Sequence, residues 1–251
     1  ATGSVDIEAI GANFLTWFAA GPADVGIQTS SVLGAADNPQ DLPFTAQAYL
    51  DAHPESVGNG GLMRTAPVAL AALNDREQVA AYAAQIASLT HAHPDSVAAC
   101  VLWSLAIQEA ITTATSDKPF GWEATVRNGL EYLDPSQQDT WNVLIGEAVT
   151  GPPTVFNPNG WVVTAFQAAL SAIVNTSEPS GQVQDHFADA LVAAVRIGHD
   201  TDTVAAIAGG LLGARWGAAV IPEEWLRLLN GQRRNGLEAL PGSTLKNLAR
   251  S

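Results

Sequence analysis

The chain has 251 residues, of which 47% are hydrophobic and 14% are charged. This length and composition predict one domain with a large buried core and exclude extensive disorder. Asp and Glu number 25 against 11 Lys and Arg, giving a formal net charge of −14, so neither nucleic acid nor an anionic membrane surface is expected as a partner.

The spacing of apolar residues predicts an all-α protein. Apolar side chains recur every three or four residues, as in Val97, Val101 and Leu105, whereas alternating strand patterns are almost absent. Prolines between the apolar runs mark the boundaries of the elements. The expected helices cover residues 6–20, 24–36, 42–52, 61–73, 75–90, 94–113, 119–133, 138–149, 159–175, 180–197, 201–217 and 222–229.

Asp24 is the first residue along the chain to suggest chemistry. It stands in the segment Gly21-Pro22-Ala23-Asp24-Val25-Gly26, at a predicted helix start. Capping the helix is the ordinary role of Asp in such a place. A carboxylate there is also able to position a water molecule or a sugar hydroxyl, so both roles stay open.

A glycine-rich loop, residues 56–64 with the sequence Ser-Val-Gly-Asn-Gly-Gly-Leu-Met-Arg, leads into the next apolar helix. Glycines allow backbone N–H groups to approach a ligand, and a helix N-terminus favours an anion such as a pyrophosphate. The same pattern also occurs in ordinary turns. For Arg64 we favour a structural carboxylate partner over a phosphate.

Two regions in the middle of the chain carry weaker signals. His91 and His93 are two residues apart, but companion ligands at zinc spacing are missing, so a ligand contact for one and helix-entry packing for the other are expected. Cys100 lies in an apolar run and is expected to be buried. The segment 151–160, rich in Pro and Asn, is the longest irregular stretch and is expected to line a cleft.

The segment His199-Asp200-Thr201-Asp202-Thr203 directly precedes a run rich in Ala and Gly. Two carboxylates and a hydroxyl at this spacing offer hard oxygen ligands, which suit Mg²⁺ or Mn²⁺ better than Zn²⁺. Capping of the following helix by Asp200 or Asp202 is the alternative. The small residues of that helix, 201–217, predict close approach of its neighbours and a central position.

Taken together and in this order, these segments resemble the ADP-ribosylglycohydrolase family. The resemblance covers nearly the whole chain, and the segments 58–64 and 200–203 are its most specific parts. The matching segments are Trp17 with residues 21–26, residues 58–67, 89–91, 159–162, 200–203, 213–214 and 221–225.

The resemblance implies an all-α, orthogonally packed, compact domain over residues 1–251 that hydrolyses the bond between ADP-ribose and its acceptor. It implies two divalent metals, Mg²⁺ or Mn²⁺, and an ADP-ribosylated protein or ADP-ribose derivative as partner. By position, Asp24 inherits a catalytic role, and Asp200, Asp202 and Thr203 inherit metal ligation. The residues expected to bind substrate are Ser56, Val57, Gly58, Asn59, Gly60, Met63 and His91.

The chain departs from the family pattern in its metal ligands. The Thr-Asp-Asp-Thr motif that supplies the other ligands in the family does not occur in this sequence. Three explanations of the missing ligands stay open. The chain is an N-terminally truncated or processed enzyme, it is a natural short homologue with half of the metal site, or another chain supplies the ligands. A non-catalytic ADP-ribose-binding or crystallin-like structural protein is the alternative function.

Two further expectations concern the rest of the chain. His199 stands where family members commonly have Gly. The first ten residues show no basic segment followed by a long apolar one, and the longest apolar stretch, 204–214, is too short to span a bilayer, so a cytoplasmic protein is expected.

Overall fold

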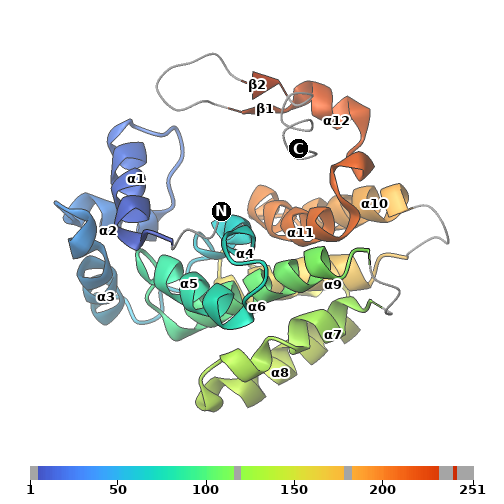
Figure 1. The fold of residues 1–251 in the computed structure, drawn as a ribbon, viewed down its shortest axis with the longest axis horizontal. Coiled ribbons are helices and arrows are strands. Elements are labelled where there is room, and N and C mark those ends of the chain that lie inside the picture. The colour runs from blue at the N-terminus through green and yellow to red at the C-terminus, as the bar shows by residue number, and fades with distance from the viewer. Residues whose placement is uncertain (1–4, 116–119, 178–182, 232–239, 242–251) are drawn as a thin grey trace.

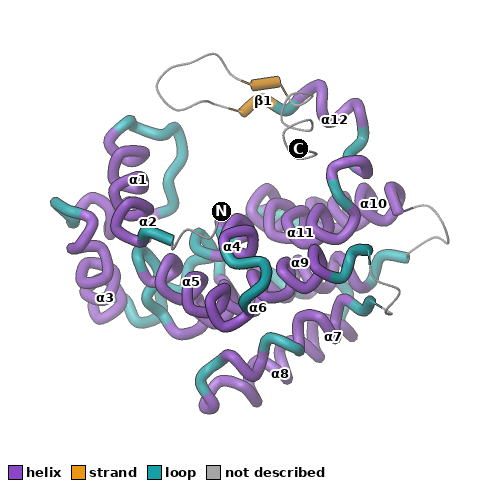
Figure 2. Tube along the Cα trace, in the orientation of Figure 1, coloured by secondary structure: helices purple, strands orange, loops and turns teal. Residues whose placement is uncertain are grey.

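The protein is built almost entirely from helices, which confirms the predicted all-α class (Figures 1 and 2). The structure, a computed structural model, describes residues 5–115, 120–177, 183–231 and 240–241. Its α-helices are α1 (Ile7–Ala19), α2 (Ile27–Ala35), α3 (Leu42–Ala52), α4 (Ala66–Ala71), α5 (Arg76–Ser88), α6 (Pro94–Thr112), α7 (Trp122–Arg127), α8 (Pro135–Thr150), α9 (Val162–Val174), α10 (Val183–Arg196), α11 (Thr201–Trp216) and α12 (Glu223–Leu228).

Short 3₁₀ turns and one small antiparallel pair of strands complete the described chain. The strands, which the sequence did not predict, are two residues each, and Asn230 pairs with Pro241. The 3₁₀ turns are η1 (Pro39–Asp41), η2 (Leu62–Arg64), η3 (Leu130–Tyr132), η4 (Pro153–Val155) and η5 (Ala218–Val220); the strands are β1 (Asn230–Gly231) and β2 (Leu240–Pro241).

Asp residues and prolines set several helix starts. The side chains of Asp6 and Asp75 accept hydrogen bonds from the backbone N–H groups three residues later, which satisfies donors that the helix itself leaves free. Asp134 accepts a hydrogen bond from the N–H of Ser136, two residues later, and with Pro135 it starts α8 three residues before the predicted position.

Other predicted helices were too long. The predicted helix 61–73 divides into η2 and α4, because Pro67 has no N–H to continue the helix from the preceding turn. The predicted helix 119–133 divides into α7 and η3 at Gly129. Residues 119 and 180–182, which the predictions placed at helix starts, lie outside the described residues.

Two hydrophobic clusters hold the helices together. The larger is built around α6, α9 and α11 and contains the fully buried side chains of Trp103, Trp141 and Phe166. The smaller joins α1, α2 and α3 through residues such as Val32 and Leu42. Figure 1 places α1–α3 on one side of the molecule and α10 and α11 on the other, so a ligand site between them draws on both clusters.

The small residues of α11 allow the close packing that the sequence predicted. A Cβ atom added at Gly210 would lie 3.2 Å from the Cβ atom of Ala66, so α4 approaches α11 closely there. The helix packs against α4, α6, α9 and α10, which confirms its central position. Cys100 is buried on α6, as expected.

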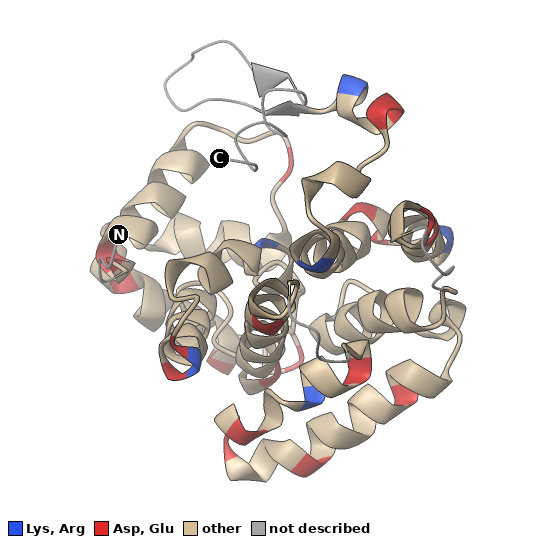
Figure 3. Ribbon diagram, turned by 45° about the vertical axis from the view of Figure 1, so that its right-hand side comes forward, with Lys and Arg blue, Asp and Glu red and all other residues tan. Residues whose placement is uncertain are grey.

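Acidic residues are spread over the helices around the molecule in Figure 3. Within residues 5–115, 120–177, 183–231 and 240–241, we find no helix with the length and apolar character needed to cross a bilayer.

The turn before α11 contains two residues with left-handed backbone, Gly198 (φ 84°) and His199 (φ 61°). This conformation favours glycine, which gives a physical reason for the Gly that the resemblance implies at position 199. A Cβ atom at Gly198 would meet nothing within 4 Å, so a substitution there tests the backbone alone.

We expect Gly198→Ala to lower the free energy of unfolding by about 1–2 kcal/mol, the cost of a left-handed alanine. Gly213→Ala is the matched control, because Gly213 also has open space but lies inside α11. Alanine is the better helix former there and should raise the free energy of unfolding by up to about 1 kcal/mol. Urea denaturation measures both, and a stabilising Gly198→Ala would contradict the prediction.

Candidate functional site

One cavity brings together most of the residues singled out in the sequence. It has a volume of about 640 Å³, within the range of about 300–1,000 Å³ usual for small-molecule sites. It lies where α1 and α2 face the glycine-rich loop and the start of α11. The predicted site residues that line it are Asp24, Ser56, Gly58, Asn59, Gly60, Met63, His91, Asp200, Asp202 and Thr203.

Val57 is the exception among the predicted site residues. It is buried and lines a neighbouring, more open cavity, which shares Ser56, Gly58 and Gly160 with the first one. Its backbone carbonyl accepts a hydrogen bond of 2.9 Å from the N–H of Val162. A contact between Val57 and a ligand in the first cavity is therefore not supported, because the residue lines only the neighbouring cavity.

Asp24 reaches the cavity from an irregular segment and does not cap a helix. The predicted helix 24–36 begins only at Ile27, with Gly26 as its N-cap residue, because Gly21 and Pro22 keep this part of the chain out of helical geometry. The capping role expected for Asp24 is therefore wrong. Its carboxylate is exposed at the cavity, where a ligand or a water can reach it.

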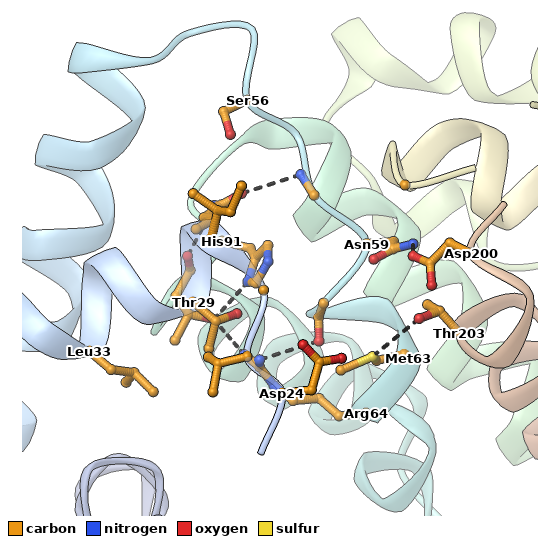
Figure 4. Close-up of a pocket in the computed structure, with 18 of the residues that line it drawn as sticks. Asp24, Thr29, Leu33, Ser56, Asn59, Met63, Arg64, His91, Asp200 and Thr203 are labelled. Atoms are coloured by element: carbon orange, nitrogen blue, oxygen red, sulfur yellow. Dashed lines mark hydrogen bonds between the residues drawn. The ribbon is translucent and has the colours of Figure 1, made fainter. Parts of the chain in front are cut away.

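Asp200 is hydrogen-bonded to the side chains of two residues from other segments, Asn59 and Asn159. Figure 4 shows Asn59 beside it. The Nδ2 atom of Asn59 donates to its carboxylate at 2.7 Å, and its own N–H donates to Oδ1 of Asn159 at 2.9 Å. Although Asp200 is the N-cap residue of α11, its side chain makes no capping hydrogen bond. The capping alternative is wrong for Asp200, and its carboxylate is turned to the cavity instead.

Asn159 is the central residue of this arrangement, and it is fully buried. Besides its bond to Asp200, its Nδ2 atom donates to the carbonyl of Gly198 at 3.1 Å, and its carbonyl accepts from Nδ2 of Asn59 at 2.8 Å. It lies at the end of the irregular segment 151–160, and Gly160 lines the cavity as expected of that segment. Asn159 belongs to the segment 159–162, which carries part of the resemblance, but its local sequence does not indicate this role.

Asp202 and Thr203 lie in the first turn of α11. Asp202 is exposed, whereas Thr203 is buried and its Oγ1 atom lies 3.8 Å from the sulfur of Met63. Figure 4 shows Asn59, Asp200 and Thr203 on one side of the cavity, with His91 and Thr29 on the opposite side. Asp200 and His91 therefore lie on opposite sides of the cavity.

The side chains of Asp200, Asp202 and Thr203 offer only oxygen atoms as ligands, which fits a hard divalent cation. The ion pairs found within the described residues involve neither Asp200 nor Asp202. In the same part of the chain, no group of three or more His, Cys, Asp or Glu side chains is placed to hold a metal ion. The chemistry of the ligands therefore fits a cation, while their number supplies only part of a coordination shell.

His91 and Arg64 form the other side of the site. Arg64 donates to the carbonyl of Gly60 at 3.2 Å and to the hydroxyl of Thr90 at 2.5 Å, and its guanidinium lies 4.6 Å from the centre of the Phe14 ring. The carboxylate partner expected for Arg64 is therefore wrong. Burial lowers the pKa of Arg64 to about 10, so it remains charged at neutral pH.

His91 is buried, and desolvation together with the charge of Arg64 lowers its pKa to about 3. It is therefore neutral at physiological pH. His93 has the helix-entry role expected for one of the two histidines, because it is the N-cap residue of α6 and accepts from the N–H of Asp95.

Gln28, which sequence analysis missed, joins α2 to both sides of the site. Its amide nitrogen donates to the carbonyl of Thr90 at 3.1 Å, and its amide oxygen accepts from the N–H of Gly58 at 3.2 Å. It lies in an ordinary helix with no neighbouring motif, so nothing in the local sequence indicates this role.

The helical fold and the cavity define a protein with a small-molecule site between helices, and comparison with known proteins identifies its class. The ADP-ribosylglycohydrolase family model matches residues 1–251, and the chain belongs to this family. A solved structure described as an ADP-ribosylglycohydrolase-related protein complex has the same fold, with a TM-score of 0.68 and 23% identity over 97% of this chain and 72% of that one.

Several curated relatives are hydrolases of ADP-ribose conjugates. ADP-ribosylarginine hydrolase Tri1 of Serratia proteamaculans is 26% identical over 84% of this chain and 52% of its own length. Human ADP-ribosylhydrolase ARH3 is 27% identical over 73% of this chain and 57% of its own length. ADP-ribosyl-[dinitrogen reductase] glycohydrolase of Rhodospirillum rubrum is 26% identical, over 92% and 68% respectively. The chain thus spans about half the length of the first two relatives.

We expect Asn159→Ala to lower the free energy of unfolding by about 2–4 kcal/mol, because it removes the partners of the Asp200 N–H and the Gly198 carbonyl. Asn128→Ala is the control: it removes one exposed side-chain hydrogen bond, to Glu109, and should cost less than about 1 kcal/mol. Urea denaturation gives both values, and equal losses would show that Asn159 does not hold the site together.

The lowered pKa of His91 predicts a pH dependence of stability. Below pH 6.5 the unfolded state binds a proton at His91, whereas the folded state does not bind it until about pH 3. The free energy of unfolding therefore decreases as the pH falls through the window from 6.5 to about 3. The expected contribution is about 1.4 kcal/mol per pH unit well inside the window.

Urea denaturation between pH 4 and pH 7.5 measures this effect. His91→Gln should flatten the dependence, whereas His53→Gln, at an exposed position after α3, should leave it as in the wild type. A wild-type slope that persists unchanged in His91→Gln would contradict the prediction.

Proposed function

We propose that this protein hydrolyses the glycosidic bond that joins ADP-ribose to a protein side chain or a related acceptor, with the help of a divalent cation. The observation that carries the proposal is the meeting of Asp24, the glycine-rich loop, His91 and the Asp200–Thr203 segment at one cavity. These segments are far apart in the sequence, and the family model that matches the chain describes ADP-ribosylglycohydrolases.

The proposed roles follow the two sides of the cavity. The carboxylates of Asp200 and Asp202 and the hydroxyl of Thr203 would hold Mg²⁺ or Mn²⁺. Such a cation would supply positive charge to the site and lower the pKa of a nearby water. The glycine-rich loop, with Arg64 and His91 beside it, would receive the diphosphate.

The proposed reaction needs one water and no cofactor that changes oxidation state. The bond between the anomeric carbon and the acceptor breaks, the water oxygen forms the new bond to that carbon, and the acceptor takes up a proton. Asp24, exposed at the cavity, would orient the water, accept its proton and pass that proton to the departing acceptor. Asn59 would act through Asp200, because its Nδ2 atom is already bonded to that carboxylate.

A non-catalytic ADP-ribose-binding or crystallin-like structural protein is the second candidate. The observation that favours it is the small number of acidic ligands, since no group of three or more candidate metal ligands occurs in the described part of the chain. Two carboxylates leave most coordination positions of Mg²⁺ to water, which weakens its binding.

Release of ADP-ribose distinguishes the two candidates. We expect the chain to release ADP-ribose from an ADP-ribosylated arginine or serine peptide with Mg²⁺ or Mn²⁺ present, and to stop when EDTA is added. Chromatography of free ADP-ribose measures the rate. Binding of ADP-ribose without release from either peptide would support the non-catalytic binding protein. Absence of both binding and release would contradict the hydrolase and the binding protein and leave the crystallin-like structural protein.

Asp202→Ala tests the metal ligand within the same experiment. We expect at least about a tenfold loss of Mn²⁺ affinity in calorimetric titration and a loss of release, because a carboxylate ligand is removed. Stability should change by no more than about 1 kcal/mol, the value of a charge in the first turn of a helix. Asp139→Ala, at an exposed position on α8, is the control, and equal Mn²⁺ affinity in the two variants would exclude Asp202 as a ligand.

A further inference from the structure

Three polar side chains form a chain of hydrogen bonds at the wall of the cavity. The Nη2 atom of Arg64 lies 2.5 Å from Oγ1 of Thr90, and the same Oγ1 atom lies 2.7 Å from Nδ1 of His91. Thr90 is fully buried and His91 is 1% exposed. Arg64 ends the glycine-rich loop, whereas Thr90 and His91 follow α5, so the contact joins two separate parts of the site.

The hydrogen-bonding capacities of these groups determine the direction of each bond. A guanidinium only donates, so the Thr90 oxygen accepts from Arg64. The hydroxyl hydrogen of Thr90 then needs an acceptor of its own. Within the described residues, the other polar atom in reach of this hydroxyl is Nδ1 of His91. Nδ1 therefore accepts, and a neutral imidazole with an accepting Nδ1 carries its hydrogen on Nε2.

The Nε2 atom of His91 faces the glycines of the loop. A Cβ atom added at Gly60 would lie 3.1 Å from Nε2, and one at Gly58 would lie 3.6 Å from it. Both glycines and His91 line the cavity. Among the described residues His91 has a hydrogen bond at Nδ1 and none at Nε2, and Nε2 is not one of the fully buried polar atoms that lack a partner. The hydrogen on Nε2 is thus placed for an acceptor that enters the cavity.

We infer that Arg64 and Thr90 are positioning residues, which hold His91 in the neutral form with its hydrogen on Nε2 so that it donates one hydrogen bond to an anionic oxygen of the ligand. Arg64 is the one lysine or arginine among the described residues that line the cavity, which favours an anion on this side. The identification of that oxygen as a phosphate oxygen of an ADP-ribose conjugate rests on the proposed function.

The charge state of His91 agrees with this role. Burial and the nearby charge of Arg64 lower the pKa of His91 to about 3, so the ring stays neutral at pH 7. Arg64 thus acts on His91 twice: its charge opposes an imidazolium, and its hydrogen bond orients the hydroxyl of Thr90 toward Nδ1.

The wild-type protein tests the inference without any substitution. Long-range ¹H–¹⁵N correlation spectra of the ¹⁵N-labelled chain at pH 7 distinguish a protonated from an unprotonated ring nitrogen. We expect His91 to show an unprotonated Nδ1 and a protonated Nε2. A hydrogen on Nδ1, or protons on both nitrogens, would overturn the inference.

A pair of substitutions at Thr90 tests the positioning role. Thr90→Val keeps the shape but removes the hydroxyl, so the hydrogen of His91 should redistribute toward Nδ1 and the Kd for ADP-ribose should rise about tenfold, the value of about 1.4 kcal/mol. Thr90→Ser keeps the hydroxyl and should retain both the wild-type spectrum and the wild-type Kd. A folded Thr90→Val protein with unchanged spectrum and Kd would overturn the inference.

The outcomes separate this inference from the proposed function. If Nε2 carries the hydrogen in the wild type but ADP-ribose neither binds nor is released, the proposed function is contradicted. The positioning of His91 by the Thr90 hydroxyl is supported in that case. If ADP-ribose is released by a chain whose His91 carries its hydrogen on Nδ1, the proposed function stands and the positioning role fails.

Discussion

The site depends on the hydrogen bonds made by the buried residue Asn159. The side-chain amide bonds to the backbone on both sides of His199, at Gly198 and Asp200, and the backbone carbonyl of Asn159 accepts from the side-chain amide of Asn59. Three segments more than 35 residues apart are thereby held in one place. Because a fully buried amide is costly to leave without partners, this geometry is maintained even though every segment involved is irregular.

Backbone pairing strengthens the same junction. Gly58 and Trp161 form an isolated antiparallel bridge, and the N–H of Asn59 donates to the carbonyl of Gly160 at 3.2 Å. The glycine-rich loop is therefore fixed against the start of α9, and α9 belongs to the main hydrophobic cluster. The loop owes its position to the core of the protein, although its own residues are mostly small and polar.

The cavity combines two opposite electrostatic surroundings in a strongly acidic protein. Asp200 and Asp202 provide carboxylates at the start of α11, and Arg64 provides the positive charge across the cavity, where His91 stays neutral. A ligand with an anionic part and a hydroxyl-rich part would match both sides. Figure 4 shows Asp200 and Thr203 on one side of the cavity and His91 on the other. The fold produces this arrangement, because Thr203 lies on α11 and His91 follows α5.

The local sequence determined which elements form and which residue types the site contains. Helical spacing of apolar residues gave α3, α5, α6 and α9 nearly at their observed bounds, and the segments 58–64 and 200–203 marked the site, because these signals lie in neighbouring residues. Only the tertiary structure decided that Asp200 is hydrogen-bonded to Asn59 and that its side chain does not cap α11. It also placed Asp24 outside α2 and Val57 at a neighbouring cavity. It also decided that Thr90 directs the ring of His91 and that Gln28 joins the two sides of the site. Each of these roles depends on which distant donor or acceptor is in reach, and that is settled by how the helices pack.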